Sequence, residues 1–414
     1  MRVLMFGWEF PPYVTGGLGV ASAGLVGGLL ETGTEVVLVL PHHPFAAGHP
    51  LLSIVDSGEV AASDDRPHRK RFLLRLRRVP SLLRPYLTDT SYREDLAAAR
   101  ETGTTFRGLY GPDLATEVLR YAEVAGRIAR RERFDVIHAH DWLTYLAGIE
   151  ARRASGRPLA VHVHATEFDR SPMGGNTFVS ETERLGVSTA DRVIAVSRYT
   201  ADTVAERYGV PRERIRVVHN AIDAHESVGA WEVSEHDPLV LFAGRITWQK
   251  GPQFFVDAAA LVAREIPNVR FAVAGSGDRL RPMMDRVASH GIERHFLFTG
   301  FLPPAELDRL YARADVYVMP SVSEPFGLTA LEALRHGTPA IVSRNAGVSE
   351  VVRNILRVDF GDTSDLASKI LSVLLFRPLS DALGAGGRGE VARLSWKDAA
   401  LKCVEIYNEL SVDR

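Results

Sequence analysis

Ser321–Pro339 has the sequence Ser-Val-Ser-Glu-Pro-Phe-Gly-Leu-Thr-Ala-Leu-Glu-Ala-Leu-Arg-His-Gly-Thr-Pro, in which a turn is followed by a helical pattern. An apolar run at 315–319 precedes it and predicts a buried strand. Pro325 and Gly327 predict a tight turn, and the helical pattern continues over about 327–336. A strand, a tight turn and a helix in this order are typical of one unit of an α/β domain.

The start of this predicted helix carries groups that suit a ligand. The backbone N–H groups of Phe326, Gly327 and Leu328 are unpaired helix-start donors, which favour an anion or a sugar hydroxyl. Glu324 and Glu332 would lie roughly 12 Å apart along the helix, whereas the two carboxylates of a glycosidase lie within about 5 to 9.5 Å. The two glutamates therefore predict contacts with the two ends of one extended ligand rather than hydrolysis of a bond between them.

A second interpretation of the same helix is open. Thr329, Glu332 and His336 share one face, and such a polar face is often ordinary solvated surface. The remaining positions are mostly apolar and indicate packing against a core. The residues of the helix alone do not decide whether this polar face contacts a ligand or solvent.

The motif itself resembles a known signature. Glu-Pro-Phe-Gly-Leu, with a second glutamate after seven intervening residues, is similar to the motif of retaining glycosyltransferases of family 4 with the GT-B fold, which include the glycogen and starch synthases. In that family the first glutamate lies by the donor sugar and the second binds the nucleotide ribose. The resemblance implies these roles for Glu324 and Glu332. The donor site that we predict here comprises Phe326, Gly327, Leu328, Thr329 and Glu332.

Composition limits the class of protein. The chain has 414 residues, which predicts two or three domains, and 46% hydrophobic with 24% charged residues is an ordinary globular balance. The net charge of −2 gives no reason to expect a nucleic-acid partner. A single cysteine, Cys403, excludes a disulfide framework within one chain and fits a reducing compartment, so we expect a cytoplasmic protein.

The apolar segments are short. The first one, Val3–Phe6, is followed by an acidic residue and two prolines, so it predicts a strand and not a secretory signal. No apolar run reaches 18 residues, and no transmembrane segment is expected. The basic run 66–78 permits weak contact with an anionic membrane surface or substrate. We favour an edge strand with a charged outer face for its alternating part, Leu74–Arg77.

A glycine loop follows the first strand. A strand, a glycine loop and a helix start allow backbone N–H groups to approach a phosphate, although two glycines often form only a tight turn. Val14-Thr-Gly-Gly-Leu18 resembles the Lys-Thr-Gly-Gly-Leu loop of glycogen synthases, with valine in place of lysine. The resemblance implies backbone contacts from Gly16 and Gly17 to the donor diphosphate. The missing lysine leaves the donor affinity and the choice of nucleotide open.

Two His-x-His pairs, His138/His140 and His162/His164, occur near the ends of apolar segments. Residues i and i+2 of a strand share a face, so each pair could hold a metal ion, and a metal-dependent hydrolase is an alternative from another class. A further histidine group, 42–49, has no carboxylate at ligand spacing, and we interpret it as a solvated loop. We interpret His138 and His162 as core histidines and predict no metal site.

The family resemblance gives other roles to the polar residues here. His140-Asp141-Trp142 resembles the His-Asp-Trp sequence of glycogen synthases near the acceptor, which implies acceptor-side roles for His140 and Asp141. His164, in His-Ala-Thr-Glu, lies where the family has an active-site histidine beside the donor sugar. Such a histidine could hold a sugar hydroxyl and help stabilise charge that forms on the ring carbon.

The second half repeats the plan of the first. An apolar strand at 239–243 leads into a glycine loop with Arg245 and Lys250, and two cations at the mouth of a strand suit a diphosphate leaving group. Alternatively, they are surface cations that cap a loop. Family enzymes carry Gly-Arg and then Lys-Gly at this spacing and use both cations on the donor diphosphate. Gly275, in a Gly-x-Gly turn, lies where the family contacts the nucleotide.

Together these patterns predict an α/β protein with the GT-B fold, in which two Rossmann-like, doubly wound parallel-sheet domains enclose a cleft. We expect an acceptor-side domain at 1–225, a linker at 226–238 and a donor domain at 239–395. The last helix, about 396–414, should pack back onto the first domain.

The resemblance covers nearly the entire chain and implies a retaining hexosyltransferase that moves glucose from ADP- or UDP-glucose to an α-1,4-glucan, as in glycogen synthesis. No cofactor and no metal are expected, because two cations already face the diphosphate. The alternatives are a family 4 enzyme with another acceptor (a surface polysaccharide, a lipid or a small sugar), a nucleotide-sugar epimerase, and the metal hydrolase. The residues expected at the reaction centre are His164, Arg245, Lys250 and Glu324.

Overall fold

The computed structural model describes residues 1–8, 10–11, 17–40, 52–55, 74–78, 114–171, 175–222 and 237–412. Several predictions concern residues outside these ranges: Gly16 and the valine before it, the histidines at 42–49, the basic residues at 66–73, and most of the linker 226–238. Within the described residues, no helix is both long enough and apolar enough to cross a bilayer.

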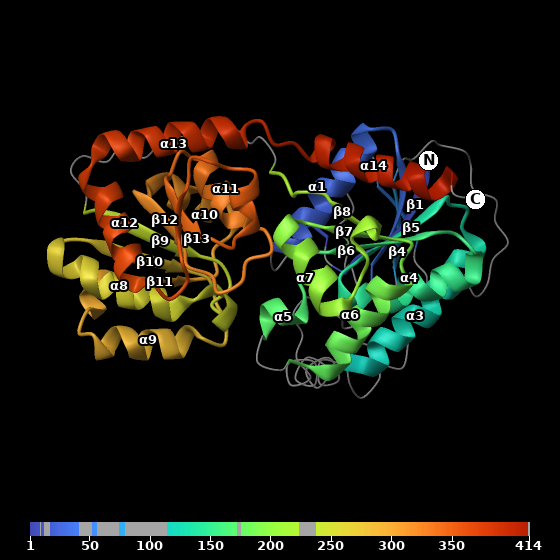
Figure 1. Ribbon diagram of the computed structural model, residues 1–414, viewed down its shortest axis with the longest axis horizontal. Helices are drawn as coiled ribbons and strands as arrows, with labels where there is room; N and C mark the ends of the chain where they lie inside the picture. The colour runs from blue at the N-terminus through green and yellow to red at the C-terminus, as the bar shows by residue number, and fades with distance from the viewer. Residues whose placement is uncertain are drawn as a thin grey trace.

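An eight-stranded sheet organises the N-terminal half, with the order β3-β4-β2-β1-β5-β6-β7-β8 and parallel pairing between all of these neighbours. Its strands are β1 (Arg2–Phe6), β2 (Glu35–Leu40), β3 (Leu52–Val55), β4 (Leu74–Arg78), β5 (Val136–His140), β6 (Leu159–Val163), β7 (Arg192–Ala195) and β8 (Ile215–Val217). Its helices are α1 (Gly17–Glu31), α3 (Leu114–Arg131), α4 (Trp142–Ser155), α5 (Glu167–Arg170), α6 (Thr177–Thr189) and α7 (Arg198–Tyr208). Figure 1 shows helices on both faces of this sheet.

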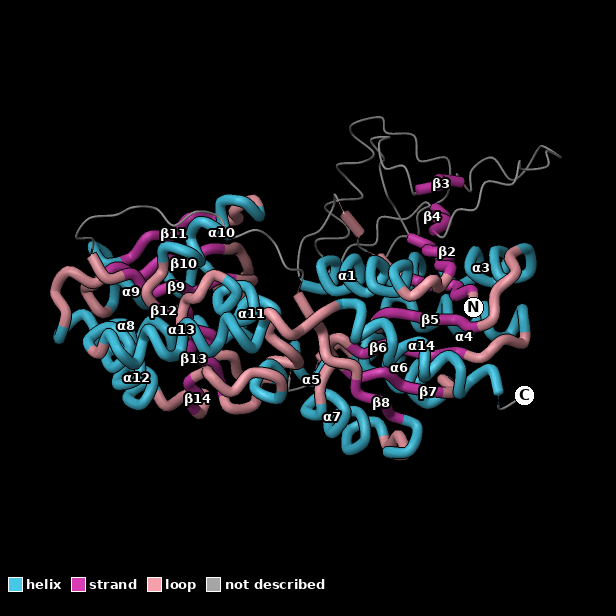
Figure 2. The backbone as a smooth tube through the Cα atoms, turned by 90° about the horizontal axis from the view of Figure 1, so that it is seen from above, coloured by secondary structure: helices cyan, strands magenta, loops and turns pink. Residues whose placement is uncertain are grey.

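A six-stranded parallel sheet organises the C-terminal half, with the order β11-β10-β9-β12-β13-β14, which is the order of a doubly wound fold. Its strands are β9 (Leu239–Ala243), β10 (Arg270–Ala274), β11 (Phe296–Gly300), β12 (Val316–Met319), β13 (Ala340–Ser343) and β14 (Leu356–Val358). Its helices are α8 (Pro252–Glu265), α9 (Leu280–Ser289), α10 (Pro304–Arg313), α11 (Leu328–Arg335), α12 (Thr363–Leu375) and α13 (Arg377–Val391). Figure 2 shows the two sheets side by side in an elongated molecule. The α/β prediction with two parallel sheets is confirmed.

Apolar runs form the central strands because a parallel sheet is covered on both faces. In β1, Leu4 and Phe6 pack into one core cluster, while Val3 and Met5 pack into another on the opposite face. The same alternation divides β9 between two clusters of the C-terminal half. Each sheet therefore holds its own pair of cores, and the loops at its carboxyl ends are free to carry polar residues.

The last helix, α14 (Trp396–Val412), leaves the C-terminal half and packs against α1 of the first half (Figure 1). Close approach requires two glycines in α1, because a Cβ at Gly24 would lie 2.1 Å from the Trp396 ring and one at Gly28 would lie 2.3 Å from the Trp396 carbonyl oxygen. At the other end, Glu409 pairs with Arg192 at 3.3 Å and with Arg216 at 3.0 Å. The chain thus returns to its starting half. The exact boundaries of the predicted domains stay a prediction, since the linker is mostly undescribed.

The prediction of an edge strand at Leu74–Arg77 is wrong. The strand exists as β4, but it pairs with β2 on one side and with β3 on the other, so that β3 is the edge. Alternation of leucine and arginine requires only that one face of the strand meets solvent, which an interior strand of an open sheet also allows. The short segment that forms β3 was not predicted as a strand.

Candidate active site

Lys250 and Glu324 meet beyond the carboxyl ends of β9 and β12. Lys250 ends a 3-10 turn, Trp248–Lys250, and Glu324 lies in the turn before α11. The lysine Nζ lies 2.5 Å from Glu324 Oε2, and Ser321 Oγ donates to the same oxygen at 3.0 Å. Among the described residues, Glu324 Oε1 has no hydrogen-bond partner, although the side chain is only 7% exposed. The pair therefore offers one carboxylate oxygen and two ammonium protons to a ligand.

The turn after Glu324 aims backbone donors in the same direction. Gly327 has φ 108°, and a Cβ there would lie 2.8 Å from the Met319 side chain, so this position requires glycine. In the part of the chain that the structure describes, the N–H groups of Gly327, Leu328 and Thr329 have no acceptor. The Phe326 carbonyl instead accepts from the Val348 N–H at 2.6 Å, which fixes the turn. The N-terminus of α11 thus presents free donors and the positive end of its dipole.

The first helix of the other half, α1, begins at the same place. A Cβ on Gly17, the first residue of α1, would lie 3.6 Å from Cδ1 of Leu328, the first residue of α11. The N-termini of α1 and α11 therefore approach each other across the two halves. Two converging helix N-termini attract an anion more strongly than one, because their dipoles and N–H groups act together.

Arg245 and Gly275 lie in adjacent loops at the carboxyl ends of β9 and β10. Arg245 is partly buried and follows Gly244 directly. A Cβ at Gly275, whose φ is 142°, would lie 1.9 Å from the Gly244 carbonyl oxygen. The two loops are therefore in backbone contact, and Gly275 positions the loop that carries Arg245.

This contact gives a stability prediction. Gly275→Ala should lower the free energy of unfolding by about 3 kcal/mol or more, because backbone strain adds to a clash with a carbonyl oxygen. Gly291→Ala is the matched control. Gly291 has φ 66°, and no atom lies within 4 Å of the point where a Cβ would be. This substitution should lower the free energy of unfolding by only about 1 kcal/mol. Equilibrium unfolding in urea measures both. Equal losses for the two variants would contradict the contact.

Glu332 lies further along α11, and its carboxylate is held from one side. Tyr311 OH donates to Glu332 Oε2 at 2.9 Å, and Oε1 has no partner among the described residues. Burial raises the pKa of the Glu332 carboxyl, while the Tyr311 hydrogen bond opposes that shift. Thr329, one turn earlier, accepts a hydrogen bond from Tyr317 OH at 2.7 Å. The structure thus places Glu324 in the turn before α11, and Thr329 and Glu332 on the helix itself.

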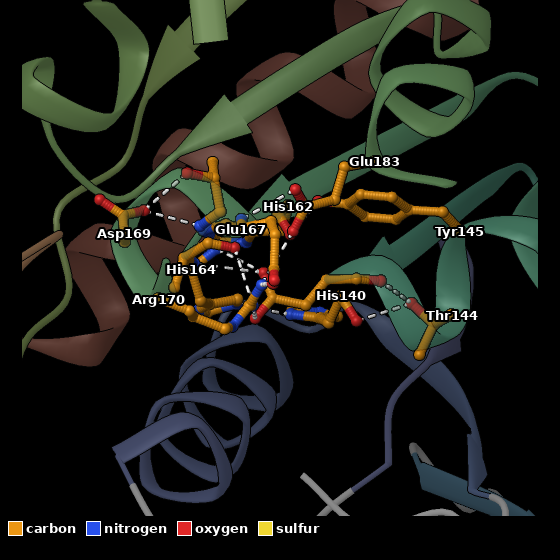
Figure 3. Close-up of polar contacts among 12 residues, drawn as sticks. His140, Thr144, Tyr145, His162, His164, Glu167, Asp169, Arg170 and Glu183 are labelled. Carbon is orange, nitrogen blue, oxygen red and sulfur yellow. Dashed lines mark hydrogen bonds and ion pairs between the residues drawn. The ribbon is translucent and has the colours of Figure 1, made fainter. Parts of the chain in front are cut away.

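On the side of the N-terminal sheet, His164 is held by two neighbours (Figure 3). Its Nε2 lies 2.9 Å from His140 Nδ1, and its backbone N–H donates to Asp141 Oδ1 at 2.7 Å. Burial raises the pKa of the Asp141 carboxyl to about 7, although Arg170 and the backbone N–H groups of His164 and Ala165 lower it. Burial, together with His140, lowers the pKa of the His164 imidazole, so the ring is neutral.

His140 and Asp141 are only 1% exposed, and Asp141 adopts φ 56° at the start of α4. Their polar side-chain partners include His164, the backbone N–H groups of His164 and Ala165, and Arg170, which lies 4.0 Å from Asp141 Oδ2. The geometry gives both residues a supporting role for His164. Direct contact with an acceptor stays a prediction.

A seam of hydrogen bonds joins the two halves beside Glu324. Ser323 Oγ donates to Asp169 Oδ1 at 2.5 Å and lies 2.9 Å from Tyr199 OH. Glu350 accepts from the backbone N–H groups of Arg198 at 2.9 Å and Tyr199 at 3.0 Å. The sequence predictions missed these residues, because the partners lie far apart along the chain and no local pattern links them.

The Glu350 contact predicts a pH dependence. Burial raises the pKa of this carboxyl, but the hydrogen bonds from His219 and from the Arg198 and Tyr199 N–H groups outweigh burial and hold the pKa below its ordinary 4.5. A lowered carboxyl pKa stabilises the fold above the unfolded-state value, and that stabilisation is lost as pH falls through the folded-state value. The Arg198 guanidinium, 3.6 Å away, faces the same carboxylate.

We therefore expect the thermal midpoint of the wild-type protein to exceed that of Glu350→Gln at about pH 6, and the difference to shrink progressively as the pH falls below the ordinary pKa of 4.5. Thermal unfolding of both proteins across this range measures it. A difference that persists unchanged in acid would show that the carboxylate charge does not stabilise the seam.

A surface hollow of about 590 Å³ lies elsewhere, at the amino ends of β1 and β5. Arg2, Arg130 and Glu132 are among its lining residues. Parallel α/β sheets bind their ligands beyond the carboxyl ends of the strands. This hollow is at the opposite end of the sheet from His140 and His164, so it is not the candidate active site.

Comparison with known proteins agrees with this geometry. The family model described as Glycosyltransferase Family 4 matches residues 87–226, and the one described as Glycosyl transferases group 1 matches residues 224–390. Glycogen synthase from Mycobacterium tuberculosis is 29% identical over 98% of this chain and 94% of its own. D-inositol 3-phosphate glycosyltransferase from Rhodococcus jostii is 32% identical, covering 74% of each chain.

Among solved structures, HepE from Anabaena in complex with UDP-glucose superposes with a TM-score of 0.67 at 18% identity, over 99% of this chain and 100% of the other. The fold and the matching families define a GT-B glycosyltransferase, and specifically a hexosyltransferase. The chain belongs to glycosyltransferase family 4.

Proposed function

We propose that this enzyme transfers glucose, with retention of configuration, from ADP- or UDP-glucose to an α-1,4-glucan. The observation that carries the proposal is the Lys250–Glu324 pair, which offers an unpaired carboxylate oxygen and unpaired ammonium protons beside the N-terminus of α11. The glycogen synthase relative supports the choice of reaction, because its similarity extends over 98% of this chain. The UDP-glucose bound by HepE supports a nucleotide-sugar donor.

The donor diphosphate would lie between the two halves. Lys250 supplies a cation, the free N–H groups at the start of α11 supply neutral donors, and the start of α1 at Gly17 approaches from the other half. We expect Arg245, in the loop that Gly275 positions, to contact the same diphosphate. These groups stabilise the negative charge that grows on the diphosphate as the sugar leaves, and such preorganised charges act most strongly in the transition state.

The sugar and the ribose would occupy the two ends of α11. Glu324 Oε1 would accept a hydrogen bond from a sugar hydroxyl, and His164 would contact the same sugar from the N-terminal half. Glu332, held by Tyr311, would accept from the ribose hydroxyls. This arrangement is the extended ligand that the spacing of the two glutamates predicts.

The reaction that fits these residues is a same-face displacement. The bond between the anomeric carbon and the phosphate oxygen breaks, the acceptor hydroxyl oxygen bonds to that carbon from the same side, and its proton passes to the departing phosphate. Glu324 is already engaged by Lys250 and Ser321, so it serves better as a hydrogen-bond acceptor than as a nucleophile. Hydrogen bonds across the seam join the two halves, and we expect this contact to limit the access of water, which is the competing acceptor.

The test is an incubation with ADP-glucose or UDP-glucose, each with and without glycogen. We expect the preferred nucleotide to be released in the presence of glycogen, and labelled glucose to appear in α-1,4 linkage at the ends of the glucan. No nucleotide release with either donor would contradict glucosyl transfer. Interconversion of the sugar without nucleotide release would instead identify an epimerase.

The inositol phosphate glycosyltransferase relative favours a second candidate acceptor, a small phosphorylated polyol. The same assay distinguishes the glucan acceptor from the phosphorylated polyol. Nucleotide release that is stimulated by D-inositol 3-phosphate and not by glycogen would establish the small acceptor and overturn the glucan assignment.

A further inference from the structure

Three histidines of two neighbouring strands, His138 and His140 of β5 and His162 of β6, lie next to His164, which follows β6; Figure 3 labels His140, His162 and His164. His138 and His140 share one face of β5, and His140 is in register with His162 of β6. The ring centroids of His138 and His140 lie 4.3 Å apart, and those of His140 and His162 lie 5.2 Å apart. His138, His140 and His162 are 0%, 1% and 2% exposed. The cluster is therefore inside the core of the N-terminal half.

The buried rings have nitrogen atoms without partners. Nε2 of His138, Nε2 of His140 and both ring nitrogens of His162 make no hydrogen bond within the described structure. Burying a polar atom without a partner costs free energy, and folded proteins rarely leave such atoms unpaired. Unpaired nitrogens on three adjacent rings indicate a ligand that accepts lone pairs from all of them.

The opposite nitrogens of two of these rings are held in place. His138 Nδ1 lies 2.6 Å from Tyr407 OH of α14, and His140 Nδ1 lies 2.9 Å from His164 Nε2. Metal-binding histidines show this pattern, because an outer partner fixes the ring and its tautomer while the other nitrogen faces the ion. In each of these rings, the nitrogen that is left unpaired is Nε2.

We propose that His138, His140 and His162 bind one divalent transition-metal ion of the zinc type. The candidate ligand atoms of the three rings all lie within 4.8 Å of one another. Tetrahedral zinc with Zn–N distances of about 2.0 to 2.1 Å would bring them to roughly 3.3 Å. The rings would have to turn from their present stacked arrangement, in which the planes of His138 and His162 differ by 8°, so that their lone pairs converge on the ion. Three imidazoles favour zinc, copper or nickel over magnesium and calcium, which prefer oxygen ligands.

The ion would have a structural and positioning role. Through His138 and Tyr407 it would connect the N-terminal sheet to α14, which arrives from the far end of the chain. Through His140 it would fix the tautomer in which Nδ1–H donates to His164 Nε2, and so orient the His164 ring. This site takes no part in bond breaking and differs from the metal hydrolase considered above.

The test uses the full chain, stripped of metal with a chelator and then titrated with Zn²⁺ or Co²⁺ alone. We expect one ion per chain for the wild-type protein, visible absorption bands of bound Co²⁺, and X-ray absorption showing histidine nitrogens about 2.0 Å from zinc. His162→Val should abolish binding, because two imidazoles remain. Tyr407→Phe should weaken it about 10- to 100-fold, the usual effect of removing an outer partner.

A control variant with His42, His43 and His49 all changed to alanine tests adventitious binding by the other histidine group of the sequence. It should keep the stoichiometry and the Co²⁺ spectrum of the wild-type protein. Wild-type protein that takes up no ion, His162→Val that binds as tightly as wild type, or binding lost in the triple variant would each overturn the proposal. If His162→Val does not fold, Tyr407→Phe and the absorption spectrum of the wild-type protein still test whether the ion binds at these histidines. None of these readouts depends on glycosyl transfer.

Discussion

Lys250→Met is expected to lower kcat for glucosyl transfer about 1000-fold, the upper range for removing one preorganised group that stabilises transition-state charge. Methionine keeps much of the length and volume of lysine, so the variant removes the charge more than the packing. The lost cation lies 2.5 Å from Glu324 and beside the free N–H groups of α11. Steady-state rates at saturating donor and acceptor measure the effect, and the donor KM should rise as well.

Lys369→Met is the matched control for this prediction. Lys369 pairs with Asp365 on α12, in the same half of the protein and away from the α11 N-terminus. Its loss should leave kcat within about 2-fold of wild type, because a surface ion pair contributes little. A Lys250→Met enzyme with normal turnover and a normal thermal midpoint would show that the diphosphate does not lie at this lysine.

Glu324→Gln is expected to lower kcat about 100-fold. The amide has the shape of the carboxylate, but hydrogen bonds to a charged acceptor are worth about 1.5 to 3 kcal/mol and each 1.36 kcal/mol is a factor of ten in rate. The neutral side chain would also release Lys250 from its present position, since the ion pair is lost. Measured rates of nucleotide release test this, with Glu265→Gln, an exposed glutamate at the end of α8, as the control.

A double variant sharpens both predictions. If Lys250 and Glu324 act as one unit, Lys250→Met combined with Glu324→Gln should be about as slow as the slower single variant, because groups that act together are not additive. Rate losses that multiply would mean that the two residues act independently. The ion pair between them would then not act as one unit in catalysis. Thermal unfolding of all three variants excludes loss of fold as the cause.

Much of the fold was predictable because its central strands are continuous apolar runs. β9, at Leu239–Ala243, lies on the segment predicted as a strand, since a parallel strand is buried on both faces and needs no alternation. The helix α11 also matches its prediction, because Gly327 and the glycine after the helix define its ends. β3 was not predictable in the same way: it has four residues and its position depends on pairing with β4.

The candidate site was predictable only where its residues share a local motif. The spacing within Glu324–Glu332 and the pattern around Arg245 and Lys250 are local, and the family resemblance adds their roles. The hydrogen bonds of Ser323 with Asp169 and of Glu350 with α7 join distant segments. The sequence shows two His-x-His pairs, but only the register of β5 against β6 reveals which rings stack and which nitrogens lack partners.

The return of α14 to the first half has a consequence for biosynthesis. Trp396, Ala400 and Tyr407 pack into the same apolar cluster as Val3 and Met5, so one face of the first sheet is completed only by a segment that is synthesised after the whole C-terminal sheet. As the ribosome extends the chain, the C-terminal sheet can assemble from contiguous residues, whereas the earlier-synthesised half stays incomplete until α14 emerges. Maturation of the N-terminal half is thus tied to synthesis of α14, and a nascent chain truncated before Trp396 would expose an apolar surface to chaperones.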